Sequence, residues 1–78
     1  MERFMVLTTT TEQPFVTRAT ELLEEAGIPV MIEHVEIMDS KNRALGYRVL
    51  VPRQYTQYAM QLVDAASFAY YQQHAANQ

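Results

Sequence analysis

The end of the first predicted helix constrains the fold most, because a helix must stop there and a strand must follow. Apolar residues recur before it at helical spacing and predict a helix over residues 12–26. That stripe comprises Phe15, Ala19, Leu22 and Ala26. Gly27 suits the left-handed position after a helix, Ile28 can contact Leu23 as in a Schellman cap, and Pro29 prevents continuation. The chain therefore turns sharply at residues 27–29.

Four threonines, Thr8 to Thr11, precede this helix. Thr11 is the predicted N-cap, with Glu12 in the first turn, where the helix dipole favours an acid. Pro14 is tolerated because it lies in that turn. Backbone N–H groups and hydroxyls here could also hold an anion, but capping explains the same threonines.

Three further segments read as strands. Residues 4–9 and 30–37 are rich in aliphatic and β-branched residues, and residues 46–51 form a third such run. The connection between the last two, residues 38–45, is short and contains the turn-rich segment 39–42, so it predicts an antiparallel hairpin. Pro52 ends the ladder because it has no N–H to donate.

A second helix is predicted over residues 54–74, with a stripe of Tyr55, Ala59, Leu62 and Ala66. The order β-α-β-β-α predicts an α+β, ferredoxin-like sandwich. Its three-stranded sheet has the order 1-3-2, with both helices on one face and no fourth strand. We expect one domain over residues 1–74 and a frayed tail over residues 75–78.

Strand alternation separates the two faces of this sheet. The face assigned to the core carries Val30, Ile32, Val49 and Val51. The other face carries Met31, Glu33, Val35, Ile37 and Leu50, with Arg48 able to pair with Glu33. A sheet covered on one side should be polar on the other, so we predict a homodimer through these five residues, or the second helix folded over them. A register one residue off would exchange the faces.

Size strengthens the expectation of a partner chain. A chain of 78 residues buries only roughly 60–65% of its unfolded surface, and small scaffolds usually need disulfides, a metal or another subunit. Cysteine is absent, which excludes disulfides, thiolate metal sites and cysteine nucleophiles. No leader and no apolar run of about 20 residues is visible, so we expect a cytoplasmic protein that does not enter a membrane.

Charge is unevenly distributed along the chain. Net charge is −3, which makes nucleic-acid binding unlikely. Residues 1–40 hold eight acidic and two basic residues, whereas residues 41–78 hold four basic residues and one acidic residue. The four cations, candidates for binding an anion or an acidic partner, are Lys41, Arg43, Arg48 and Arg53. Ordinary surface charge is the alternative interpretation, and the five tyrosines read as packing residues more readily than as base-stacking ones.

Catalytic motifs are weak. Only two glycines are present, without the pattern of a phosphate loop or a dinucleotide site. His34 and Glu36 share a strand face, but one histidine with strand carboxylates favours a structural role, and His74 lies in a polar tail. We expect no metal, cofactor or catalytic residue. The alternative is a small dimeric ferredoxin-fold enzyme, monooxygenase-like or isomerase-like, with a cavity near His34 and Tyr47.

One family shares several of these features. Leu22-Leu23-Glu24-Glu25-Ala26-Gly27-Ile28, a hairpin, Val49-Leu50-Val51-Pro52 and a helix containing Ala59 resemble a small bacterial domain family of unknown function. It carries the provisional label of prokaryotic signal transducing protein and is grouped with PII-like ferredoxin folds. The resemblance covers about residues 4–66 and implies a PII-like fold and a regulatory role. True PII proteins bind nucleotide and 2-oxoglutarate through a long loop between the second and third strands.

Here that connection is short and lacks glycine, so no ligand residues are transferred. We therefore expect a non-enzymatic regulatory or interaction module. It would act as a small oligomer, with a dimer favoured, that binds a partner protein or a small ligand.

Overall fold

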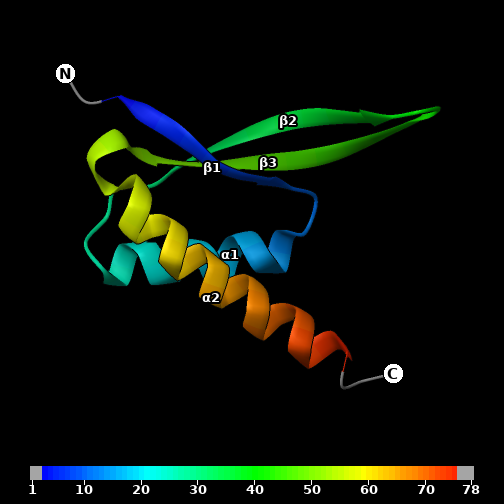
Figure 1. The fold of residues 1–78 in the computed structure, drawn as a ribbon. Helices are drawn as coiled ribbons and strands as arrows, with labels where there is room; N and C mark the ends of the chain where they lie inside the picture. The colour runs from blue at the N-terminus through cyan, green and yellow to red at the C-terminus, as the bar shows by residue number, and fades with distance from the viewer. Residues whose placement is uncertain (1–2, 76–78) are drawn as a thin grey trace.

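Three strands and two helices follow one another in the predicted order (Figure 1). The computed structural model describes the backbone of residues 3–75 and the side chains of residues 3–38 and 40–67. The elements are β1 (Phe4–Thr10), α1 (Gln13–Glu25), β2 (Met31–Asp39), β3 (Asn42–Pro52), a 3₁₀ turn η1 (Arg53–Tyr55) and α2 (Thr56–Ala75). The predicted frayed tail lies largely outside the described residues, as do the side chains of Phe68, Tyr70, Tyr71 and His74.

The sheet has the order β1-β3-β2, with β3 antiparallel to both neighbours. Both helices lie on the same side of it (Figure 1). This confirms the predicted ferredoxin-like α+β arrangement. The central position of β3 follows from its apolar run Val49–Val51, since a strand flanked on both edges loses the most solvent.

The C-terminus of α1 confirms the predicted Schellman cap. Gly27 has a φ of +77°, its N–H donates to the Glu24 carbonyl at 2.9 Å, and the Ile28 N–H donates to the Leu23 carbonyl at 2.9 Å. Those two bonds satisfy carbonyl groups that the helix leaves open. The N-cap prediction is wrong, because β1 continues to Thr10 and the cap position falls at Glu12. The hydroxyl of Thr10, rather than that of Thr11, accepts the Glu12 N–H at 3.1 Å.

The hairpin of β2 and β3 is longer than predicted. The strands pair from Met31↔Leu50 to Asp39↔Asn42, leaving only Ser40 and Lys41 in the turn. Ser40 has a φ of +52°, which is typical of the first residue in a tight hairpin turn. The prediction that β3 starts at Gly46 is wrong, because residues 42–45 find cross-strand partners on β2.

β1 pairs with β3 only as far as Thr10↔Tyr47. Residues 36–45 therefore form a two-stranded arm that extends beyond the helices (Figure 1). Its apolar side chains remain in solvent: Leu45 is 79% exposed and Met38 is 65% exposed.

The core lies between the helices and the helix-facing side of the sheet. Buried residues from every main element except β2 build it: Leu7, Phe15, Val16, Ala19, Leu23, Ile28, Val49, Val51, Ala59, Val63 and Ala66. Val30 and Ile32 pack against this cluster, so the predicted core face is confirmed and the shifted register is wrong. Ala19 and Ala59 have no exposed surface, as expected where small residues let α1 and α2 approach closely.

Candidate functional site

The side of the sheet away from the helices carries a continuous apolar row. Val6, Leu50 and Met31 are paired across β1, β3 and β2, so their side chains point to the same side. We call this side the helix-free face; its residues are Val6, Met31, Glu33, Val35, Ile37, Arg48 and Leu50. Leu50 is 7% exposed although it lies outside the core cluster, while its neighbours Val6 and Met31 are 48% and 44% exposed. The row therefore presents Val6 and Met31 to solvent, with the buried Leu50 between them.

One ion pair interrupts this apolar surface. Arg48 Nη1 lies 3.5 Å from Glu33 Oε1, and the two residues occupy directly paired positions on β3 and β2. This is the cross-strand pair that the sequence predicts. Both side chains are about half exposed, so the pair is worth little in stability, about 0–1 kcal/mol. Its importance is that the charged side chains described on this face are one arginine and one glutamate.

Next to the ion pair, Gly46 provides a depression in β3. Gly46 is buried, and the side chain of Ile37 lies across it, so that a Cβ added to Gly46 would collide with Ile37 Cδ1. The same Cβ would lie 3.2 Å from the Thr10 carbonyl oxygen. The absence of a side chain at Gly46 thus lets Ile37 fold down onto the strand, and Val35 and Ile37 remain half-buried.

The alternative in which the second helix covers this face is wrong. α2 lies beside α1 on the opposite side of the sheet (Figure 1). Within the described part of the chain, no helix packs over the five predicted interface residues (Figure 1). Sequence reasoning missed Val6, because it tested alternation on the two hairpin strands and left β1 out.

The four predicted cations are not brought together. Lys41 lies in the hairpin turn, and Arg43 and Arg48 point to opposite faces of β3. Arg43 Nη1 lies 3.3 Å from Glu36 Oε1, so each of these arginines is paired with a glutamate of β2. Arg53 follows the other end of β3, about 30 Å from Arg43 at the usual rise of a strand, and its N–H donates to the Arg3 carbonyl at 2.7 Å.

His34 and Tyr47 do meet, on the helix-facing side of the hairpin. Their rings are edge to face, with centroids 5.3 Å apart and an interplanar angle of 62°. His34 is exposed, and among the described residues no three histidine, aspartate or glutamate side chains gather as a metal site would require. The contact is an ordinary aromatic cross-strand pair.

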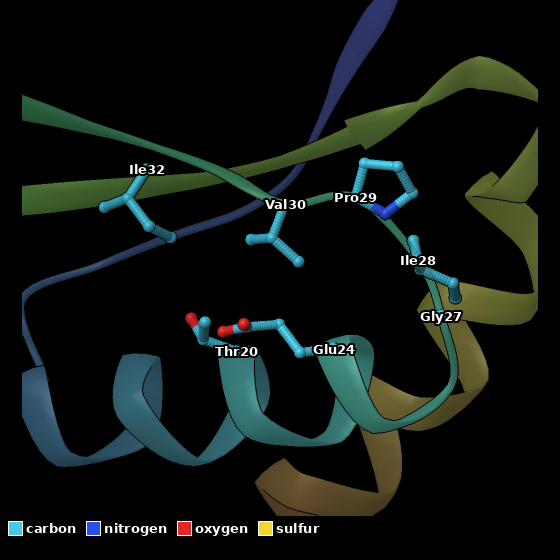
Figure 2. A pocket seen from close by; sticks show the side chains of 7 residues that line it. All are labelled: Thr20, Glu24, Gly27, Ile28, Pro29, Val30 and Ile32. Atoms are coloured by element: carbon cyan, nitrogen blue, oxygen red, sulfur yellow. The ribbon is translucent and has the colours of Figure 1, made fainter.

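A cleft of about 440 Å³ opens between α1 and β2 (Figure 2). It is lined by Thr20, Glu24, Gly27, Ile28, Pro29, Val30 and Ile32. Figure 2 shows Thr20 and Glu24 pointing from α1 toward Val30 and Ile32, with the 27–29 turn closing one end. Neither His34 nor Tyr47 lines it.

Sequence reasoning missed this cleft, because nothing in the local pattern distinguishes Thr20 and Glu24 from the other polar residues of α1.

A scan against protein-family models and searches of curated proteins and solved structures found no match for this chain. The resemblance to the signal-transducing family therefore stays a prediction. Among the described residues, no helix has the length and apolar character needed to cross a bilayer.

Proposed function

We propose that this chain is a non-enzymatic interaction module that works as a homodimer, with the helix-free face as the surface between the two copies. The observation that supports this most is the apolar row Val6–Leu50–Met31, which spans all three strands in a place no helix covers. Apolar rows of this kind seldom stay exposed on a monomer.

The charges on this face favour a second copy as the partner. A twofold axis brings each residue of one copy to the partner residue of the other, so contacts come in reciprocal pairs. With one cation and one anion about equally exposed on the face, Arg48 of each copy can approach Glu33 of the other. The face is thus self-complementary in charge as well as apolar.

The size of the face fits a modest interface. Three strands about 4.8 Å apart, with the longest about 30 Å long, cover a flat area of roughly 430 Å², which is smaller than the ~800 Å² per partner of a standard interface and typical of a weak association. We therefore expect an association that depends on concentration in the micromolar range.

The regulatory role and the cytoplasmic location inferred from the sequence belong to the same proposal. His34 and Tyr47, the pair on which an enzyme would depend, do not line the described cleft.

A pair of methionine variants tests the dimer. Met31 on the helix-free face and Met60 on α2 are 44% and 40% exposed, so they are matched in type and accessibility. Met31→Lys should abolish the concentration-dependent dimer in sedimentation velocity, because it places a charge in the interface, whereas Met60→Lys should leave it intact. Circular dichroism checks that both variants are folded. A monomeric wild-type protein at about 100 μM, or equal behaviour of the two variants, contradicts the proposal.

A further inference from the structure

The outer edge of β2 is open and unusually regular. β2 pairs with β3 over nine residues without a break, whereas the edge strand β1 has an irregularity between Val6 and Thr8. Edge strands are commonly protected by proline, a bulge or charged side chains; β2 contains no proline and no register shift, and its acidic residues would repel an acidic strand but not a basic one. This edge is therefore the better template for another strand.

The register shows which main-chain groups are available there. A two-residue turn closes on a pair that exchanges both of its hydrogen bonds, here Asp39 and Asn42, and such pairs alternate along an antiparallel ladder. By this alternation, the N–H and C=O groups of Ile32, His34 and Glu36 point away from β3. The side chains of these three residues lie on the helix-facing side.

The cleft lies directly beside this edge. Ile32 and Val30 form its upper wall, and Thr20 and Glu24 of α1 form its lower wall (Figure 2). A strand added to β2 would place the residue opposite Ile32 on the same side of the sheet, and that side chain would enter the cleft. A volume of about 440 Å³ is ample for one or two aliphatic side chains against Val30, Ile28 and Ile32.

Glu24 determines the charge of the occupant. Its carboxylate forms no ion pair with any described residue, and it lies in the last turn of α1, where the helix dipole disfavours an anion. A lysine or arginine of a bound partner beside Glu24 would supply the missing ion pair and offset the unfavourable interaction with the helix dipole.

A second β2 strand suits this edge poorly. β2 carries Glu33, Glu36 and Asp39 and has no lysine or arginine, so two copies paired edge to edge would bring acids together.

We propose that the β2 edge and the adjoining cleft bind an extended basic peptide, which adds to the sheet as a fourth strand with an aliphatic side chain in the cleft and a cationic one at Glu24. Main-chain hydrogen bonds to Ile32, His34 and Glu36 would give affinity, and the cleft would give specificity. This site rests on the proposed role as an interaction module, but not on the dimer, because the helix-free face lies on the other side of the sheet.

A synthetic peptide tests the site. The probe is an acetylated and amidated heptapeptide in which threonine alternates with lysine, isoleucine and valine, titrated into ¹⁵N-labelled wild-type protein. We expect amide shifts confined to residues 20–36. We also expect Glu24→Lys to weaken binding about tenfold, since it replaces an attraction by a repulsion beside the cationic side chain of the peptide. Glu25→Lys, an equal charge change at an exposed position outside the cleft, should weaken binding less than twofold.

Other results overturn the proposal. These are no shift at about 1 mM peptide, shifts confined to β1, or equal binding to the Glu24→Lys and Glu25→Lys proteins. Substituting proline for the central isoleucine should abolish binding, because it removes a ladder N–H, and unchanged binding would mean that no strand is added.

Sedimentation of the same proteins separates the two proposals. Loss of the dimer in Glu24→Lys but not in Met31→Lys would place a second copy in the cleft and reject the peptide. Peptide binding by a monomeric wild-type protein would reject the dimer alone.

Discussion

Gly46→Ala adds one methyl group at a point on the helix-free face where Ile37 and the Thr10 carbonyl already lie close to the strand. The new Cβ would collide with Ile37 Cδ1, approach Ile37 Cγ1 at 3.0 Å, and lie 3.2 Å from the Thr10 carbonyl oxygen. Ile37 is half-buried and can rotate away, but the carbonyl belongs to β1 and cannot move without disturbing the β1–β3 ladder. The substitution therefore tests whether the close contact of three strands at this point contributes to stability.

Two effects of opposite sign determine how much Gly46→Ala changes the free energy of unfolding. Replacing glycine by alanine inside a strand raises the free energy of unfolding by about 0.5–1 kcal/mol, because alanine loses less conformational entropy on folding. Overpacking a filled site costs about 1–3 kcal/mol. We expect a net loss of about 1–2 kcal/mol, which lowers the melting temperature of a domain this size by about 4–16 °C.

Urea unfolding followed by circular dichroism, at one fixed protein concentration, measures this loss. Ile37→Ala removes both Ile37 atoms that the new methyl group would meet and leaves only the Thr10 contact. In that background, Gly46→Ala should cost at least about 1 kcal/mol less, because contacting residues are coupled in a double-mutant cycle. Additive losses, or a Gly46→Ala protein as stable as the wild type, would refute the packing described for this face.

Two further substitutions test the core and the helix cap. Leu23→Ala removes a side chain with no exposed surface from the core and should lower the free energy of unfolding by about 2–5 kcal/mol in urea titrations; a loss under about 1 kcal/mol would mean that the core collapses around the cavity. Gly27→Ala should cost about 1–2 kcal/mol because of its φ of +77°, since no atom within 4 Å would meet the new Cβ. Gly27→Asn should cost less, because asparagine tolerates the left-handed region, and equal costs for both variants would contradict a backbone origin.

The fold was predictable because independent local signals agreed. The helix stop at Gly27–Pro29, the short connection between two β-rich runs, and the apolar centre of β3 each allow few alternatives, and together they define the strand order. The length of the hairpin was not predictable from propensity. Residues 42–45 are strand only because β2 lies beside them, which is a tertiary effect.

The candidate surfaces were predictable only in part. Alternation along β2 and β3 correctly separated Met31 and Leu50 from the core, since side-chain direction follows from strand period alone. The basic patch was not, because Arg43 was expected in the connection; as part of β3 it lies an odd number of residues from Arg48, so the two side chains point to opposite faces. The cleft depends on how α1 sits beneath the edge of β2, which no local pattern encodes.

The length of the two-stranded arm can vary without a change in the core. Residues 36–45 form no ladder pair with β1 and contribute no residue to the core cluster, so shortening or extending the arm beyond Ile37 leaves the interior as it is. A tight turn must still close on a hydrogen-bonded pair, and a change of one residue in a strand exchanges its faces. Viable insertions and deletions in this arm should therefore come in steps of two residues per strand, so that related chains could differ widely in reach while sharing one core.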